Sequence, residues 1–208
     1  MVLISVLPIA TNCLKLNLSK TKEIVFKRPR VQYFHMPPLA DIEQLDCCKL
    51  LGVIFQSNFK MDSHIQFILS QCAQRLYLLK LLRHQGLPDA QLSVIANAVI
   101  VSRLLYALPA WGGFLSVELV NRINAFLRRM QRFGYLQCHI TVAELMNKSD
   151  HDLFCKLCAP THALNHLLPP TRNRASLTTR RHSYQLPEYS TDLHKKSVLI
   201  RSSYSFVK

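Results

Sequence analysis

Apolar positions follow two different patterns along the chain, and the pattern changes near Asp62. Before it, short apolar runs at residues 23–26 and 50–55 are bounded by charged residues and prolines. Short runs rich in β-branched and aromatic side chains, bounded in this way, predict strands. We therefore expect a small antiparallel β-sheet remnant in residues 1–60, too small to be stable alone.

From Asp62 the apolar positions recur at steps of three and four residues, as they do on one face of a helix. This stripe consists of Ile65, Leu69, Cys72, Leu76 and Leu79. Asp62 or Ser63 can cap the start of the helix, and the sequence Gly86-Leu87-Pro88 ends it. An amphipathic helix of this kind buries its stripe against other helices.

The next stretch, residues 89–108, is apolar nearly all round, and Arg103 is the only charged residue between Ala90 and Val117. Such a helix is usually the buried centre of a bundle. A membrane span is the competing interpretation, because the stretch is close to the spanning length. An arginine in mid-span costs about 2.5–3.5 kcal/mol, and Asn97 also interrupts the run. We therefore favour the buried helix and do not expect a membrane partner.

A third helix is predicted over residues 117–133, with Ser116 as its cap. Its polar positions carry several arginines. Further along, Thr141 and Glu144 have the spacing of a capping box, in which each side chain binds the other's backbone amide.

A fourth helix is predicted at residues 150–158, and Pro160 stops it. From Pro169 onward the chain is polar, basic and short of long apolar runs. This composition predicts an extended or disordered tail. The expected fold class is therefore mainly α, with a small antiparallel β remnant (residues 1–60), a three- to four-helix thumb-like bundle (residues 61–168) and a loose basic tail (residues 169–208).

Charge adds a functional direction to this picture. The 208-residue chain has 26 Lys and Arg against 12 Asp and Glu, a formal net charge of +14 at pH 7. A chain this basic favours polyanionic partners, with nucleic acid first and an anionic membrane second. The excess is largest in residues 121–208, which carry 14 basic and 5 acidic side chains.

Half of the 26 Lys and Arg residues fall into three clusters. The first is Lys20, Lys22, Lys27, Arg28 and Arg30; the second, on the third helix, is Arg122, Arg128, Arg129 and Arg132; the third, in the tail, is Arg172, Arg174, Arg180 and Arg181, with Tyr184 nearby. Lys and Arg neutralise phosphates, and interleaved aromatic rings can stack on bases. The alternative for any one cluster is a solvated basic face.

One group of residues has the composition of a structural zinc site, namely His151, Cys155, Cys158 and His162. Their spacing places all four on one helical stripe, which cannot surround a tetrahedral ion unless the chain bends near Pro160. The alternative is a pair of small apolar thiols facing a core, with histidines near a helix end. We favour this alternative and expect no metal and no cofactor.

Other catalytic motifs are missing from the sequence. It contains no glycine-rich phosphate loop, no Gly-x-Ser-x-Gly and no His-x-Asp. The acidic group of Asp41, Glu43 and Asp46 has no accompanying ligand for a two-metal site. Seven cysteines, an odd number without a secreted-scaffold spacing, predict reduced thiols and an intracellular protein, in the nucleus or the cytoplasm.

Three motifs occur in a characteristic order. Residues 12–26 read Asn-Cys-Leu-Lys-Leu-Asn-Leu-Ser-Lys-Thr-Lys-Glu-Ile-Val-Phe, residues 49–53 read Lys-Leu-Leu-Gly-Val, and residues 106–113 read Tyr-Ala-Leu-Pro-Ala-Trp-Gly-Gly. In this order they resemble the palm edge, the primer-grip hairpin and the thumb of reverse transcriptases from non-LTR (LINE-like, jockey-type) retrotransposons. The resemblance covers roughly residues 11–201 and implies descent from an RNA-directed DNA polymerase.

The same resemblance implies a loss of catalysis. In that family the metal-binding Asp residues lie upstream of these motifs, and this sequence contains no Asp-Asp pair. Phosphoryl transfer of this kind needs two metals held by carboxylates, so the chain is not expected to be an enzyme as it stands. Segments like residues 12–86 are also known as an N-terminal AlkB-homologue region. That name would imply 2-oxoglutarate dioxygenase activity, which needs a His-x-Asp iron site that the sequence lacks.

We therefore expect a truncated, non-catalytic reverse transcriptase fragment that binds the duplex backbone without sequence preference. The missing palm and fingers of the polymerase are a further implied partner. The resemblance, together with the charge pattern, assigns nucleic-acid contacts to Lys20, Lys22, Lys49, Gly52, Arg122, Arg128, Arg129 and Arg132. The alternative is a structural or interaction protein with no nucleic-acid partner.

Overall fold

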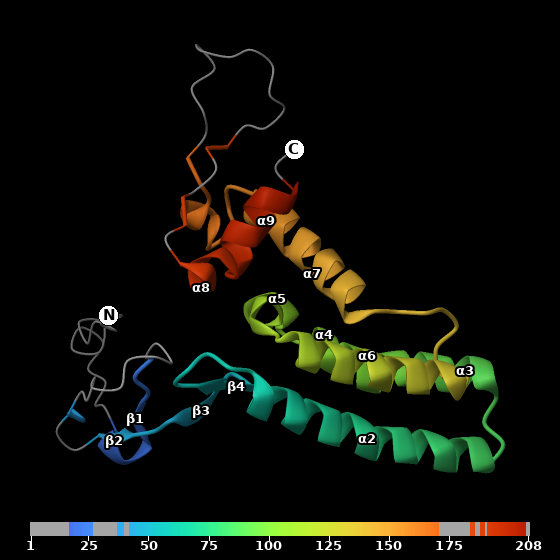
Figure 1. Ribbon diagram of the computed structural model, residues 1–208. Helices are drawn as coiled ribbons and strands as arrows, with labels where there is room; N and C mark the ends of the chain where they lie inside the picture. The colour runs from blue at the N-terminus through green and yellow to red at the C-terminus, as the bar shows by residue number, and fades with distance from the viewer. Residues whose placement is uncertain are drawn as a thin grey trace, which may run out of the picture. The chain divides into compact units, whose positions relative to one another are not determined.

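The computed structural model describes residues 17–26, 37–39, 42–170, 184–185, 188–189 and 191–206 (Figure 1). The chain divides between Lys60 and Met61 into two compact units, where the sequence analysis also placed a boundary. We call residues 1–60 the hairpin unit and residues 61–208 the helical unit. The predicted fold class, mainly helical with small two-stranded sheets before the helices, is confirmed.

The hairpin unit contains two small sheets. A 3-10 helix η1 (Leu18–Lys20) precedes β1 (Lys22–Glu23), which pairs in parallel with β2 (Glu43–Gln44), while β3 (Cys47–Leu50) pairs antiparallel with β4 (Val53–Gln56). The expected antiparallel pairing therefore holds for the second sheet only. The strand predicted over residues 23–26 is also displaced, because β1 ends at Glu23.

A two-residue turn interrupts the strand that the sequence pattern predicted over residues 50–55. Leu51 and Gly52 have φ angles of 46° and 88°, so both lie in the left-handed region. Two consecutive residues of this kind form the tight turn that suits the twist of a hairpin. Gly52 adopts this conformation without strain, whereas a leucine there costs roughly 1–2 kcal/mol.

Helix α2 (Asp62–His84) forms as the apolar stripe predicts. Four members of the stripe are buried, but Leu69 is only half-buried, and the buried face also includes His64 and Ile68. The helix ends where predicted, because Gly86 has a φ of 89° and the backbone amide of Leu87 reaches back 3.1 Å to the carbonyl of Leu82.

The apolar stretch after α2 is not one continuous helix. It consists of α3 (Asp89–Ala96), a π-helical segment η2 (Asn97–Val101), α4 (Ser102–Leu105), α5 (Leu108–Trp111) and the 3-10 helix η3 (Gly112–Phe114). Helix α4 ends because Tyr106 leaves the helical conformation and Ala107 is left-handed, with a φ of 51°. Continuing the helix would press the ring of Pro109 against the carbonyl of Leu105.

Five of the buried residues of this stretch recur every four positions: Leu92, Ala96, Ile100, Leu104 and Leu108. An α-helix has 3.6 residues per turn, so a strict four-residue repeat drifts around its surface. The wider turn of η2 compensates for this drift and keeps the repeat on one face. The predicted buried centre is therefore correct for that face, while Val94 and Tyr106 on other faces are exposed.

Among the residues that the structure describes, one stretch has the length and hydropathy of a membrane span, Asp89–Phe114, with a mean hydropathy of 1.6. Core helices of soluble proteins pass the same test. The uninterrupted helical part from Asp89 to Leu105 is 17 residues long, or about 25 Å, against a hydrocarbon core of about 30 Å.

Helix α6 (Val117–Arg132) begins as predicted, with the Ser116 hydroxyl accepting the amide of Leu119 at 3.3 Å. Helix α7 (Val142–Leu157) begins eight residues before the predicted start at residue 150. The capping box explains the difference, since Thr141 and Glu144 bind each other's backbone amides at the first turn of α7.

The expectation of an extended tail is wrong for residues 191–206. They form α8 (Asp192–Lys195) and α9 (Val198–Phe206), after a 3-10 helix η4 (Asn165–Leu167), and α9 packs against α7. The physical reason is Arg201, whose guanidinium donates to both carboxylate oxygens of Asp150 on α7, at 2.6 and 2.7 Å. Arg172, Arg174, Arg180 and Arg181 lie outside the described residues.

Trp111 belongs to the buried core of the helical unit. It is fully buried, its ring meets that of His64 on α2 edge to face at 5.1 Å, and its indole nitrogen donates to the carbonyl of Tyr106 at 2.9 Å. Helix α5 is thereby fixed against α2.

Candidate nucleic-acid interface

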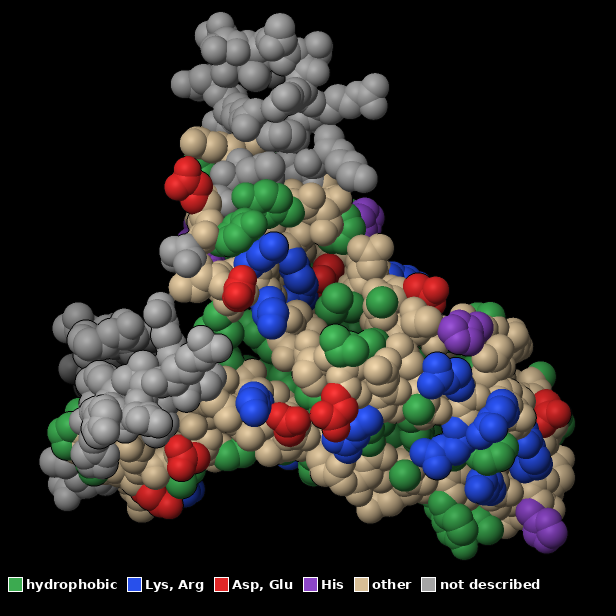
Figure 2. Space-filling view, viewed as in Figure 1, with side chains coloured by type: hydrophobic (Ala, Val, Ile, Leu, Met, Phe, Trp, Pro, Cys, Tyr) green, Lys and Arg blue, Asp and Glu red, His purple; other side chains and the backbone are tan. Residues whose placement is uncertain are grey.

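Helices α2 and α6 run in the same direction, so their C-terminal ends lie together. Arg122 near the start of α6 donates to Gln66 near the start of α2. At the other end, Lys80 lies 4.8 Å from the ring of Phe133, and Arg83 lies 4.3 Å from the ring of Tyr135. Figure 2 shows Lys and Arg side chains gathered over this end of the two helices.

We call this group the α2–α6 cluster. It comprises Lys80 and Arg83 from α2 and Arg128, Arg129 and Arg132 from α6. The three α6 arginines are all exposed. Three of the four predicted α6 arginines therefore share one region, and Arg122 lies apart from them, half-exposed and bound to Gln66.

Among the described residues, acidic side chains do not neutralise the exposed arginines of α6. Within the described part of the chain, Arg128, Arg129 and Arg132 form no ion pair with a carboxylate. Two carboxylates that could have paired with them are used elsewhere, since Glu144 caps α7 and Asp150 binds Arg201. The cluster keeps most of its positive charge, and one ion pair reduces it, between Arg83 and Asp89 at 3.0 Å.

Two aromatic rings beside the cluster, those of Phe133 and Tyr135, pack against cations instead of presenting free faces to bases. Tyr135 is buried and Phe133 is half-buried, and each ring is occupied by a basic side chain. Arg129 also lies 5.5 Å from the ring of Phe126. This arrangement favours contact with phosphates over base stacking.

Sequence reasoning missed Lys80 and Arg83 as members of this site. Nothing local distinguishes them from other basic positions on a helix. Because α2 and α6 are about fifty residues apart, only the parallel packing of the two helices brings these cations together. A weak signal was available, since both helices carry basic side chains in their last turns.

The predicted contacts of the hairpin unit have different environments. Lys22 pairs with Glu43 across the β1–β2 sheet, so its charge is partly neutralised. Lys20 is exposed at the end of η1, and Lys49 is exposed on β3. Gly52 forms the turn of the β3–β4 hairpin. In the hairpin unit Lys20 and Lys49 are thus two predicted cations that the structure shows as exposed.

The candidate metal ligands that the structure describes do not come together in one site. Within the described ranges, no group of three His, Cys, Asp or Glu side chains converges on a common point. The sulfur of Cys155 lies 3.7 Å from His151, one turn away on α7, while Cys158 receives the hydroxyl of Tyr184 at 3.8 Å. In the acidic group, Glu43 is engaged by Lys22, and Asp41 lies outside the described residues.

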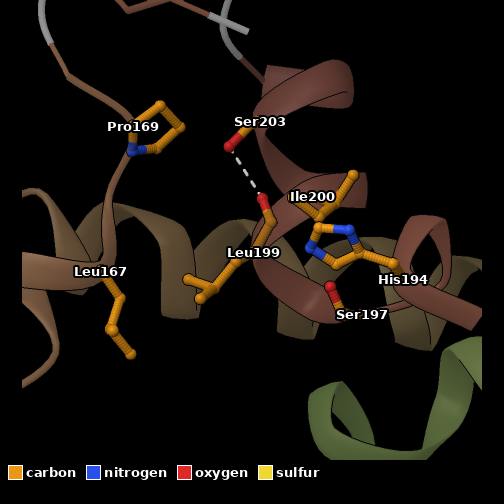
Figure 3. A pocket seen from close by; sticks show the side chains of 7 residues that line it. All are labelled: Leu167, Pro169, His194, Ser197, Leu199, Ile200 and Ser203. Atoms are coloured by element: carbon orange, nitrogen blue, oxygen red, sulfur yellow. Dashed lines mark hydrogen bonds between the residues drawn. The ribbon is translucent and has the colours of Figure 1, made fainter. Parts of the chain in front are cut away.

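A shallow cavity lies between α8, α9 and the segment after η4 (Figure 3). Its volume is about 170 Å³, below the roughly 300–1,000 Å³ of typical ligand sites. Leu167, Pro169 and Ile200 contribute apolar walls, and the hydroxyl of Ser203 already donates to the carbonyl of Leu199 at 2.7 Å. His194 and Ser197 also line the cavity, but its volume is too small for a typical small-molecule substrate.

One buried basic side chain loses its charge. Burial, together with the positive charge of Arg103, lowers the pKa of His64 from 6.5 to about 4. His64 is therefore neutral at pH 7 and contributes packing against Trp111, not positive charge.

A comparison of the chain with protein-family models, with curated proteins and with solved structures finds no match.

Proposed function

We propose that the helical unit binds the sugar–phosphate backbone of nucleic acid without sequence preference, through the α2–α6 cluster. The observation that carries the proposal is the concentration of five cations from two helices at one end of the unit. Four of them, Lys80, Arg128, Arg129 and Arg132, are exposed and form no ion pair with a described carboxylate. Each cation that neutralises a phosphate releases counterions, which makes such binding favourable and steeply dependent on salt.

Helix geometry offers a structural explanation for the same residues. The C-terminal ends of α2 and α6 carry partial negative charge, and cations in a last turn stabilise it by about 0.3–1 kcal/mol each. Arg83, Arg129 and Arg132 occupy such positions. Arg128 lies outside the last turn, so its position is not explained in this way. Binding predicts that removing these arginines changes the affinity for nucleic acid, whereas helix stabilisation predicts a change in stability alone. An experiment can therefore separate the two explanations.

The binding test compares two triple variants of the full chain. One carries Arg128→Gln, Arg129→Gln and Arg132→Gln; the matched control carries Lys148→Gln, Lys156→Gln and Lys196→Gln, which removes the same charge from exposed positions on α7 and after α8. Fluorescence anisotropy with a labelled B-form duplex, at several salt concentrations, gives the log–log slope. We expect the slope to flatten by up to about 2.7 in the first variant, about 0.9 per lost contact.

The control variant should show a smaller change in slope, because it alters the total charge but not the cluster. Equal slopes in the parent and the Arg variant, with both proteins folded by circular dichroism, would contradict the proposal. Equal losses in both triple variants would show that net charge acts without a defined site.

We further propose that the chain is non-catalytic and derives from the C-terminal part of a non-LTR retrotransposon reverse transcriptase, an intracellular protein whose natural partner is a polymerase palm and fingers. The motif order supports this origin, and the sequence lacks an Asp-Asp pair to hold two metals. Purified 208-residue protein should give no primer extension on RNA or DNA templates with Mg²⁺ or Mn²⁺. Extension by homogeneous protein would overturn this part of the proposal.

A second candidate function is that of a protein-interaction module. Tyr77, Leu78 and Leu81 of α2 are 62%, 56% and 43% exposed. They lie one to four residues apart, so they form one apolar patch on the helix surface. Such a patch suits a protein partner. This function predicts that Tyr77→Gln with Leu78→Gln abolishes capture of the partner, while the slope with nucleic acid stays unchanged.

A further inference from the structure

The tip of the β3–β4 hairpin presents two large apolar side chains to solvent. Leu50 is 59% exposed and Leu51 is 83% exposed, and no other large apolar side chain in the described part of the chain is as exposed as Leu51. The tip is held by a regular antiparallel ladder in which Leu50 pairs with Val53 and Lys49 with Ile54. The two leucines are therefore displayed on a defined turn.

Backbone conformation makes this display costly. Leu51 has a φ of 46° in a turn that favours Asn or Gly at that position. The leucine is thus both strained and largely exposed. Strained residues persist at functional sites more often than elsewhere, and an exposed apolar pair suits a contact surface.

The charge around the tip indicates what it contacts. Lys49 directly precedes the two leucines, and residues 50–59 carry no charged side chain. The nearest carboxylate in the sequence is Asp46, at the base of the hairpin, where it accepts the hydroxyl of Ser57 at 3.2 Å. The tip therefore combines an apolar end with a flanking cation, and residues 50–59 of the sequence add no carboxylate that would repel a phosphate.

This combination matches one form of nucleic-acid recognition. Proteins that deform duplexes insert Leu, Ile, Met, Phe or Pro between base steps, and adjacent cations hold the flanking phosphates. A two-stranded ribbon is narrow enough to enter a groove. A groove on another protein would also accept the leucines. The flanking cation and the net charge of +14 favour a polyanionic partner instead.

We propose that the hairpin tip is an apolar wedge, in which Leu50 and Leu51 insert at a base step of a duplex and unstack it while Lys49 contacts a neighbouring phosphate. The proposal rests on the proposed nucleic-acid binding, but it assigns to the hairpin unit a task separate from that of the α2–α6 cluster. It concerns deformation of the duplex, whereas the cluster supplies affinity.

The test uses the full chain and a duplex carrying 2-aminopurine, whose fluorescence rises when its base unstacks. The variant combines Leu50→Thr, which suits a strand, with Leu51→Asn, which suits the left-handed turn. The hairpin should therefore persist while the apolar end is removed. The matched control is Val94→Gln with Val117→Thr, which removes two exposed apolar side chains from the helical unit.

We expect a several-fold rise in 2-aminopurine fluorescence when the parent or the control binds, and a loss of most of that rise with the wedge variant. The salt slope of the wedge variant should stay that of the parent. Binding by the parent without a fluorescence change would overturn the wedge and leave the proposed function intact. The wedge would also be overturned, with the proposed function intact, if the wedge variant kept the full rise in 2-aminopurine fluorescence. A change in oligomeric state alone would overturn it in the same way. Absence of any binding by the parent would overturn both proposals.

Discussion

At the C-terminal end of α6, Arg128 and Arg132 extend into solvent, whereas at the junction of α5, α7 and α9 the guanidinium of Arg201 is enclosed. Arg201 donates to both oxygens of Asp150 and to the backbone carbonyls of Pro109 and Lys196, each of the last two at 2.7 Å. Its side chain is 15% exposed and that of Asp150 is 6% exposed. One residue type thus has two opposite environments within one unit.

The difference shows how to separate structural from functional arginines. Arg201 uses its donors within the fold, on the distant residues Asp150 and Pro109 and on the nearby carbonyl of Lys196, so it has little capacity left for a ligand. Arg128, Arg129 and Arg132 of α6 are exposed to solvent instead. Burial and the number of internal acceptors, not residue type or local charge, therefore identify which arginines can bind phosphate.

His64 adds a third environment for a basic side chain. It is buried, and burial together with Arg103 lowers its pKa to about 4, so it carries no charge at pH 7. An arginine cannot respond in this way because its guanidinium stays protonated in proteins. A buried arginine needs an acid such as Asp150, whereas a buried histidine can become neutral.

The largest expected effect comes from breaking the Arg201 junction. Arg201→Ala leaves the Asp150 carboxylate buried without its partner, which costs about 3–5 kcal/mol. Urea unfolding followed by circular dichroism measures the loss. As a control, Arg201→Met combined with Asp150→Leu removes both charges and should restore most of the stability. A loss below about 1 kcal/mol in the single variant would show that Arg201 is not the enclosed structural arginine described here.

The second prediction concerns pH. The pKa of His64 is about 4 in the folded protein and about 6.5 when unfolded, so the unfolded chain binds a proton first as the pH falls. Stability should be intact above pH 6.5 and decline between pH 6.5 and 4, by up to about 3 kcal/mol.

Stability curves at several pH values test this prediction. His64→Phe keeps an aromatic ring beside Trp111 and cannot be protonated. This variant should lose less stability than the parent between pH 6.5 and 4. Parallel curves for parent and variant would show that another group controls the acid response.

A third prediction concerns Gly113, which packs closely against Arg201 and Lys196. A Cβ atom added at Gly113 would lie 2.2 Å from Nη1 of Arg201 and 2.2 Å from the carbonyl oxygen of Lys196. Gly113→Ala must therefore displace the backbone of the junction and should cost about 1–3 kcal/mol. The effects of Gly113→Ala and Arg201→Ala should be less than additive, because both disturb one contact. Strict additivity would show that the two residues act independently.

The smallest effect is expected where the arginines are exposed. Arg128→Gln, Arg129→Gln and Arg132→Gln together should lower the unfolding free energy by about 2 kcal/mol or less. Gln is nearly as good a helix former as Arg, so the loss is limited to the interactions of Arg129 and Arg132 with the helix end and of Arg129 with the ring of Phe126. A loss of several kcal/mol in the same unfolding experiment would move these arginines into the structural class with Arg201.

Sequence alone determined the features that depend on neighbours within one or two helical turns. The buried stripe of α2, the Ser116 cap, the stop at Gly86 and the capping box at Thr141 all follow from interactions between residues a few positions apart. The exposed arginines of α6 belong to the same class, since their positions on the helix follow from its period. The placement of α7 was missed at its start only because the capping box was not joined to the helix that follows it.

Tertiary structure alone decided the features that depend on distant segments. Asp150 and Arg201 are 51 residues apart, and no local sequence pattern predicts that they form an ion pair. Lys80 joins the α6 arginines only because α2 and α6 pack in parallel. The turn at Leu51 and Gly52 depends on the pairing of β3 with β4 as well as on the glycine. Local sequence fixes which face of a helix is apolar or charged, but the fate of each charge is set by which distant acid, carbonyl or solvent that face meets after packing.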